Sequence, residues 1–153
     1  MVVMADKSVP TSDHIRDIIS FVEASPTSYH AVAELTRRLE QAGFQRLEET
    51  ESWPSVEGRR YVVRDGAVIA WITPEKVTPQ LGARIVGSHT DSPSFKLKPN
   101  ATVTNQGWQQ VGMEVYGGGL LNSWLDRDLG LSGRLVTCDG RAHLVRTLSL
   151  IHI

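Results

Sequence analysis

His89 and Asp91 are the two residues of this sequence whose types and spacing best suit chemistry. They follow the apolar pair Ile85-Val86, which we interpret as a buried strand, so they fall at a strand's carboxyl end, where ligands gather in open α/β sheets. Residues i and i+2 of an extended segment point to the same side. A metal-bound histidine donates its second ring N–H to an acceptor such as a carboxylate. The pattern therefore suits a metal-binding His89 oriented by Asp91, and it also suits a histidine beside an ordinary Asp-Ser-Pro turn.

Three longer motifs resemble the aspartyl aminopeptidase family of zinc peptidases. In chain order they are A-S-P-T-S-Y-H-A-V-A-E-L-T-R-R-L-E-Q-A-G-F, G-S-H-T-D-S-P-S-F-K-L-K-P-N and Y-G-G-G-L-L-N-S-W-L-D-R-D-L-G-L-S-G-R, and the likeness extends from Ser12 to Arg146. The resemblance implies a metallo-aminopeptidase that uses two Zn²⁺ ions in each active site. It carries the family's first metal ligand over to His89 and the catalytic, orienting aspartate over to Asp91.

The same resemblance implies a cytoplasmic enzyme that removes N-terminal residues, by preference Asp or Glu, from peptides and that assembles as a homo-oligomer. Family members carry the other ligands, a bridging aspartate, a glutamate, a further aspartate and a late histidine, well downstream of these motifs. The chain stops before them. We therefore expect an N-terminal fragment that is inactive by itself.

The predicted fold class is α/β, a truncated zinc-peptidase-type sheet flanked by helices and followed by the start of an inserted β-rich assembly domain. Residues 12–100 are predicted to form the N-terminal part of the catalytic domain, and residues 101–147 to begin the inserted domain. Residues 148–153 depart from the family, and L-S-L-I-H-I matches one frame of a transposon mosaic end used in library preparation. We expect a non-native tail there, with His152 not a ligand; the alternative is a real C-terminal strand.

Two amphipathic helices are predicted near the start. Apolar residues at helical spacing form two groups, Ile15, Ile18, Ile19 and Val22, then Val32, Leu35 and Leu39. Ser12 or Asp13 is the expected N-cap of the first helix and Thr27 or Ser28 that of the second, which ends at Gly43. The resemblance places Ala24 to His30 near the active site, although Tyr29 and His30 at a helix start are commonly just packed or solvated.

Two hairpins are predicted further along, with two separate strands between them. Residues 60–64 and 67–72 flank the turn signal Asp65-Gly66, and residues 131–136 and 141–145 flank Asp139-Gly140. Between them, Phe95 and Leu97 alternate with lysines, and Val111, Met113 and Val115 form a further alternating strand. The glycines 117–119 then allow a tight turn or a close backbone approach.

Several charged residues have two interpretations. Lys96 and Lys98 could attract an acidic substrate side chain, but we favour the interpretation that they lie on a solvated face of the strand. Asp126 and Asp128 could be metal ligands together with His143, with Arg127 as an anion clamp, in a different metal-dependent hydrolase. We favour a buried ion-pair and capping network at residues 122–128 and a strand-face role for His143. A small binding module is the other alternative.

Composition narrows the classes of partner. The chain has 153 residues, 41% hydrophobic and 22% charged, which is ordinary for a globular domain. A formal net charge of −1 without a basic patch argues against nucleic-acid and membrane-surface partners. The single cysteine, Cys138, excludes an internal disulfide and a cysteine zinc site, suits a reducing cytosol and is expected to be buried. No run approaches the ~18 apolar residues of a membrane span.

Overall fold

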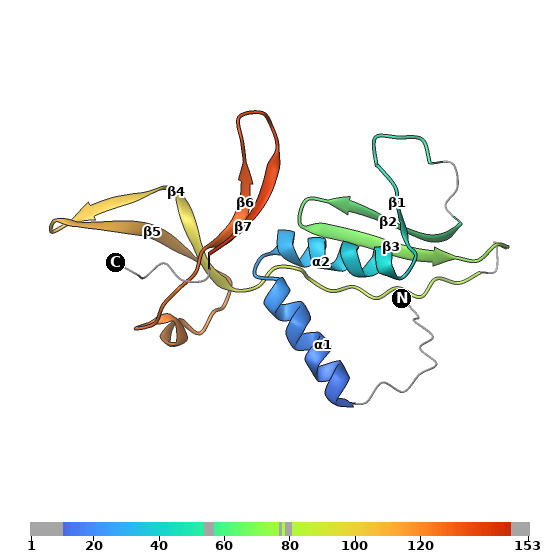
Figure 1. Cartoon of the computed structure of the whole chain (residues 1–153), viewed down its shortest axis with the longest axis horizontal. Coiled ribbons are helices and arrows are strands. Elements are labelled where there is room, and N and C mark those ends of the chain that lie inside the picture. Colours follow the sequence, from blue (N-terminus) through green and yellow to red (C-terminus); the bar gives the residue numbers. More distant parts are fainter. Residues whose placement is uncertain (1–10, 54–56, 77, 79–80, 148–153) are drawn as a thin grey trace. The chain divides into compact units, whose positions relative to one another are not determined.

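The computed structural model describes residues 11–53, 57–76, 78 and 81–147, which form a mixed α/β chain (Figure 1). Its elements are α1 (Thr11–Ala24), α2 (Ser28–Gln41), β1 (Gln45–Arg46), β2 (Gly58–Arg64), β3 (Ala67–Thr73), β4 (Ser94–Asn105), β5 (Trp108–Tyr116), the 3-10 helix η1 (Leu121–Trp124), β6 (Ser132–Val136) and β7 (Ala142–Arg146). The α/β class is confirmed. In place of one sheet flanked by helices, however, the described strands form three small sheets, β1-β2-β3, β4-β5 and β6-β7.

The chain divides into two compact units. Among the described residues, the first unit lies within 11–90 and 132–146, and the second comprises 91–131 and 147. The division falls between Thr90 and Asp91, inside the H-x-D motif. The expected domains, 12–100 and 101–147, stay a prediction, and the tail 148–153 lies outside the described residues.

Both predicted helices are present in the first unit. The Thr27 side-chain oxygen accepts a hydrogen bond from the backbone N–H of His30 at 3.3 Å, which satisfies one of the donors left open at the start of α2. Gly43 follows the helix with a φ of 79°, the left-handed conformation that glycine adopts readily. The cap prediction for α1 is wrong, because Ser12 and Asp13 lie within its first turn.

The core of the first unit lies where α2 packs on the β1-β2-β3 sheet. Among the described residues the buried apolar side chains are Ala31, Val32, Tyr61 and Val62. The Tyr61 hydroxyl donates to Glu40 Oε1 at 2.6 Å, joining β2 to α2. Burial and this hydrogen bond raise the pKa of Tyr61 to about 12.

An ion pair joins the two helices. Arg38 of α2 pairs with Asp17 of α1 at 2.8 Å, and Arg37 and Arg38 both donate to Glu34. Hydrogen bonds from Arg37 and Arg38 lower the pKa of Glu34 to about 2. The apolar stripe of α1 stays exposed by 51–63% at each of its members, Ile15, Ile18, Ile19 and Val22.

The hairpin around Asp65-Gly66 is confirmed, but the strand predicted at Ile85 and Val86 is wrong. Strands β2 and β3 pair antiparallel from Gly58↔Thr73 to Arg64↔Ala67, and Asp65 adopts a φ of 52° in the turn. Residues 81–93 have no regular structure, and Ile85 and Val86 are 88% and 77% exposed. A strand needs a neighbour for its backbone N–H and C=O groups. None of the described strands pairs with this segment.

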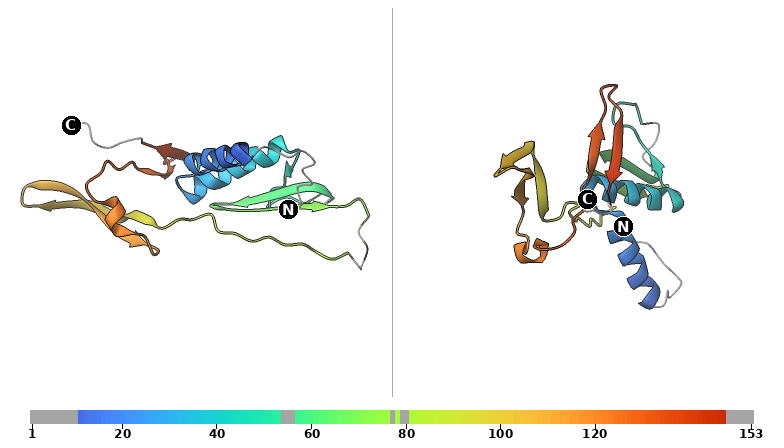
Figure 2. Two further views of the ribbon diagram at one scale, coloured as in Figure 1. Left: turned by 90° about the horizontal axis from the view of Figure 1, so that it is seen from below. Right: turned by 60° about the vertical axis from the view of Figure 1, so that its left-hand side comes forward.

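The second unit is dominated by the long β4-β5 hairpin (Figure 2). The predicted strands are confirmed, and β4 continues beyond Pro99-Asn100 because a register shift between Leu97 and Thr102 absorbs the proline. The hairpin loop is Gln106-Gly107, and both residues have positive φ, as a tight two-residue hairpin loop requires. Four apolar residues of this hairpin, Leu97, Val111, Met113 and Val115, are exposed by 37–55%, and Trp108 is 73% exposed.

Strands β6 and β7 pair antiparallel from Ser132↔Arg146 to Val136↔Ala142, which confirms the last predicted hairpin. Cys138 lies in its turn and is exposed, so the expectation of a buried thiol is wrong. A two-stranded hairpin tip has no second layer to cover it.

Within the described part of the chain, neither helix has the length and apolar character that crossing a membrane requires.

Candidate functional site around the H-x-D motif

The H-x-D motif is anchored to the first unit through its middle residue. Thr90 is half-buried, and its hydroxyl donates to the backbone carbonyl of Gly66 at 2.6 Å. His89 lies just before it in the irregular segment and is exposed. The β2-β3 turn therefore fixes the backbone position from which His89 extends.

The turn at Gly66 lies against the start of α2. A Cβ at Gly66 would lie 2.7 Å from Ser28 Oγ, which is closer than real Cβ atoms approach, and 3.0 Å from Ser28 Cβ, which is a very tight contact. Only glycine fits there without movement. Because Thr90 bonds to Gly66 and Gly66 contacts Ser28, the predicted proximity of the A-S-P-T-S-Y-H motif to the H-x-D motif is supported.

Strand β6 adds a second support to this turn. Arg134 Nη1 pairs with Asp65 Oδ1 at 2.6 Å, and the Arg134 guanidinium carbon lies 4.2 Å from the centre of the Tyr29 ring. Stacking of a guanidinium on an aromatic face is a favourable cation–π contact. Tyr29 is thus held in place by packing.

His30 belongs to the capping arrangement of α2. Its Nδ1 and the Thr27 hydroxyl share a hydrogen bond of 2.8 Å. Burial lowers the pKa of His30, and the nearby positive charge of Arg146 lowers it further. Arg146 itself donates to the backbone carbonyl of Glu23 at 2.6 Å, near the end of α1. His30 therefore favours its neutral form and supports the helix start.

Asp91 begins the second unit and accepts a hydrogen bond there. The Tyr116 hydroxyl donates to Asp91 Oδ2 at 2.5 Å, and Lys96 Nζ lies 3.3 Å from the centre of the Tyr116 ring. The bond to Asp91 raises the pKa of Tyr116, which keeps the phenol protonated as a donor. Lys96 is exposed and lies on a strand face, and here it also stacks on an aromatic ring.

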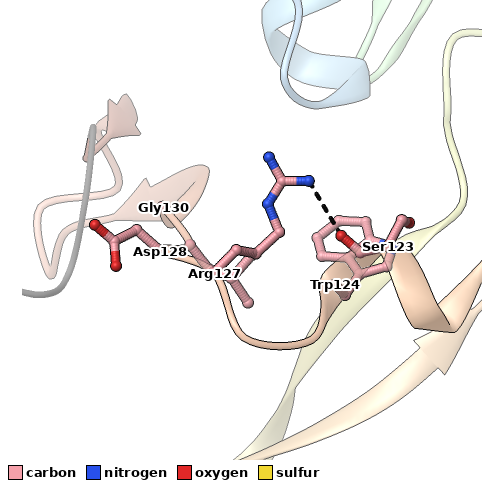
Figure 3. A pocket seen from close by; sticks show the side chains of 6 residues that line it. Ser123, Trp124, Arg127, Asp128 and Gly130 are labelled. Atoms are coloured by element: carbon pink, nitrogen blue, oxygen red, sulfur yellow. Dashed lines mark hydrogen bonds between the residues drawn. The ribbon is translucent and has the colours of Figure 1, made fainter.

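The segment 122–128 does not form the buried network that we expected. Arg127 Nη1 donates to the backbone carbonyl of Ser123 at 3.1 Å, and Asp126 adopts a φ of 51°. Arg127 and Asp128 are exposed and line an open hollow of about 330 Å³, in which the Asp128 carboxylate points away from the Arg127 guanidinium (Figure 3). The expectation fails because these strongly hydrated side chains remain in water, where charged groups are most favourable.

The donor chemistry suits zinc only in part. Imidazole nitrogen is a common zinc ligand, so His89 can supply one coordination position. A catalytic zinc needs three protein donors. Within the described ranges, no group of three or more His, Cys, Asp and Glu side chains gathers closely enough to hold a metal ion. Asp126, Asp128 and His143 therefore form no alternative site there, and His143 is an exposed residue of β7.

A family model described as "Aminopeptidase I zinc metalloprotease (M18)" matches residues 21–152. The chain belongs to this M18 family. It is 54% identical over 132 residues to "Probable M18 family aminopeptidase 2" of Streptomyces avermitilis, a match that covers 86% of this chain and 31% of that protein. The resemblance read from the three motifs is thereby confirmed. The chain spans less than a third of the length of this M18 relative.

Solved structures of M18 proteins share the fold. The crystal structure of yeast aminopeptidase 1 matches with a TM-score of 0.80 at 32% identity, over 89% of this chain and 34% of that one. A structure of the S. cerevisiae mApe1 dodecamer matches with a TM-score of 0.79, also at 32% identity, over 89% of this chain and 34% of that one. Two helices and small sheets of the present chain thus correspond to the N-terminal part of M18 aminopeptidases.

Sequence reasoning missed three residues that support the motif, Gly66, Tyr116 and Arg134. A signal for Tyr116 was available, because it ends the alternating strand of Val111, Met113 and Val115 just before three glycines. Pairing that strand with the one at Phe95 would have placed it near Asp91. Gly66 and Arg134 had no comparable signal, because their contacts join segments far apart in the sequence.

Proposed function

We propose that this chain supplies the H-x-D portion of the active site of a metallo-aminopeptidase. In the complete enzyme His89 binds one of two zinc ions, and Asp91 orients the His89 ring. The substrates are peptides, with N-terminal Asp or Glu preferred. Membership of the M18 family across residues 21–152, which includes the motif, is the observation that carries this proposal.

The anchoring of the motif supports these roles. Thr90 holds the backbone beside His89 to the Gly66 turn, and Tyr116 holds the Asp91 carboxylate. His89 itself is exposed to solvent. A pair of bound metal ions supplies the polarisation of the scissile carbonyl and the activation of water. The chain's own part is to hold one imidazole and its orienting carboxylate.

Ligand count leads us to propose that the chain alone is inactive. A single imidazole cannot hold zinc in a site that needs three protein donors. Purified with zinc or manganese, the chain should not release Asp or Glu from aminoacyl substrates above background. Metal-dependent turnover that a chelator abolishes would contradict this ligand count.

The experiment for the site uses the enzyme restored to full length. His89→Ala removes a metal donor, so bound zinc and turnover should both fall nearly to background. Asp91→Asn keeps every donor but weakens the orientation of His89, so metal affinity or activity should fall about 10–100-fold, with partial recovery in excess metal. Elemental analysis, a metal titration of turnover and thermal melting measure these effects.

Matched controls come from the same chain. His143→Ala removes an exposed strand histidine, and Asp128→Asn removes an exposed carboxylate, and both should leave metal content and turnover unchanged. If His89→Ala keeps full metal content and a near-normal rate, the motif is not the site. If only Asp91→Asn is harmless, the orienting role alone is wrong.

We also propose that the complete enzyme is a cytoplasmic homo-oligomer. A structurally similar yeast protein is described as a dodecamer, and this chain exposes apolar residues along α1 and along the β4-β5 hairpin. Contiguous exposed apolar surface marks interaction sites. Sedimentation of the full-length enzyme tests the assembly, and a monodisperse monomer at tens of micromolar would contradict it.

A further inference from the structure

We infer that Tyr116 is a positioning residue for the reaction, acting through Asp91. The inference rests on the proposed role of Asp91 in orienting His89. Its basis is the hydrogen bond from the Tyr116 hydroxyl to Asp91 Oδ2 at 2.5 Å, within the range of the short bonds that hydroxyl donors make to carboxylates.

The register of the β4-β5 hairpin places this hydroxyl. Tyr116, the last residue of β5, lies opposite Ser94, the first residue of β4, and Asp91 precedes Ser94 by three positions. Residues directly opposite in an antiparallel pair share a face of the sheet. The strand pairing therefore brings the phenol to the segment that carries Asp91.

The Tyr116 ring is itself held. Lys96 Nζ lies 3.3 Å from the ring centre, and Glu114 lies opposite Lys96 and two residues before Tyr116, on the same face. A cation over the ring face restrains its orientation.

The backbone next to Tyr116 is fixed against the same segment. Gly117 has a φ of 74°, and a Cβ there would lie 3.2 Å from Pro93 Cβ and Cγ. Both the positive φ and the close approach favour glycine. The end of β5 therefore contacts the Asp91-to-Pro93 segment twice, through the Tyr116 hydroxyl and through the Gly117 backbone.

A hydroxyl donor fixes the rotation of a carboxylate because it commits one oxygen to a defined direction. In the proposed site, Asp91 orients the metal-binding histidine and the hydroxyl in turn orients Asp91. Residues that hold a ligand in this indirect way affect metal affinity. Loss of the Tyr116 hydroxyl should leave every metal donor in place and loosen Asp91. Tyr116 acts on the metal only through the chain of Asp91 and His89.

The test compares Tyr116→Phe with Tyr61→Phe in the full-length enzyme. Tyr116→Phe removes one oxygen and keeps the ring under Lys96, so zinc affinity, measured by competition with a chromophoric chelator, should fall about 3- to 30-fold. The kcat should fall at subsaturating zinc and recover in excess zinc. Tyr61→Phe removes a buried hydroxyl bound to Glu40, so it should lower the melting temperature and leave zinc affinity unchanged.

A double-mutant cycle decides whether Tyr116 acts through Asp91. In an Asp91→Ala background, Tyr116→Phe should cause no further loss of zinc affinity, because contacting residues that act together are not additive. The same cycle on the unfolding of the metal-free protein should show a positive coupling between the two residues.

Three results would overturn the inference. They are a Tyr116→Phe enzyme with wild-type zinc affinity, a loss in Tyr116→Phe that adds fully to that of Asp91→Ala, and an equal loss in Tyr61→Phe. Each of these results leaves the proposed metal site intact if His89→Ala and Asp91→Asn still lose zinc binding and turnover. If those two variants bind zinc normally, the proposed function fails first and the inference falls with it.

Discussion

Gly66→Ala tests the contact that supports the H-x-D motif from the first unit. The added Cβ would lie 2.7 Å from Ser28 Oγ and 3.0 Å from Ser28 Cβ, and the Gly66 carbonyl also accepts the hydrogen bond from Thr90. Either the Asp65-Gly66 turn or the first turn of α2 must move. We expect the free energy of unfolding to fall by about 1–3 kcal/mol, the usual cost of inserting a methyl into a filled space.

A second substitution tests whether Ser28 is the residue with which the added methyl collides. Ser28→Gly removes both Oγ and Cβ, so in that background Gly66→Ala should cost no more than about 0.5 kcal/mol, and the coupling should equal most of the original loss. Ser28→Gly alone should cost up to about 1 kcal/mol through helix propensity. The matched control is Gly133→Ala in β6, where an added Cβ meets no atom within 4 Å. It should be neutral or stabilising by up to about 1 kcal/mol, because glycine in a strand interior carries an entropic cost.

Urea unfolding followed by far-UV circular dichroism measures all four variants. Equal slopes against urea would show that the extent of unfolding is the same and that the midpoints report stability. The reasoning is refuted if Gly66→Ala unfolds within about 0.5 kcal/mol of the parent, since that is the range of neutral surface changes. If Gly66→Ala lowers the free energy of unfolding by the same amount in the Ser28→Gly background, the methyl collides with another group.

Other predictions follow from the same structure. The Glu34 pKa of about 2 lies below its ordinary 4.5, so the stabilisation from Arg37 and Arg38 should be complete above pH 4.5 and lost as the pH falls toward 2, and Glu34→Gln should remove that part of the pH dependence of melting. Because the Tyr61 pKa is raised from 10.0 to about 12, an absorbance titration should show a phenol that ionises near pH 12, and this step should vanish in Tyr61→Phe. Ile18→Glu should reduce concentration-dependent association in sedimentation experiments, because Ile18 is 62% exposed on an apolar stripe; unchanged association would show that the stripe is not the contact.

Elements with local determinants could be predicted from the sequence. The Thr27 cap, the Gly43 stop and the Asp65-Gly66 turn each depend on a few adjacent residues, and all three appear in the structure. The two predicted hairpins pair as expected, whereas the pairing of β4 with β5 was not predicted. The ends of the strands were harder to predict. In β4, for example, a register shift lets the strand continue past Pro99.

Features that depend on distant partners could not be predicted. Ile85 and Val86 look like a buried strand, but burial requires a neighbouring strand that local sequence does not specify. Asp126 and Asp128 could be ligands or buried ion pairs by residue type, and the structure leaves Asp128 exposed. Two supports of the candidate site behave alike, since the contacts of Gly66 with Ser28 and of Arg134 with Asp65 join segments far apart in the sequence.

The exposed turn of the β6-β7 hairpin carries the only thiol in the sequence, at Cys138. Any disulfide that this chain forms with another copy must therefore join two Cys138 residues. In samples without reductant, a covalent dimer linked at the hairpin tips would add to whatever association the apolar surfaces cause. Oligomer measurements on this chain thus need a reducing agent or a Cys138→Ser variant, and the same thiol offers a single position for attaching a fluorescent label.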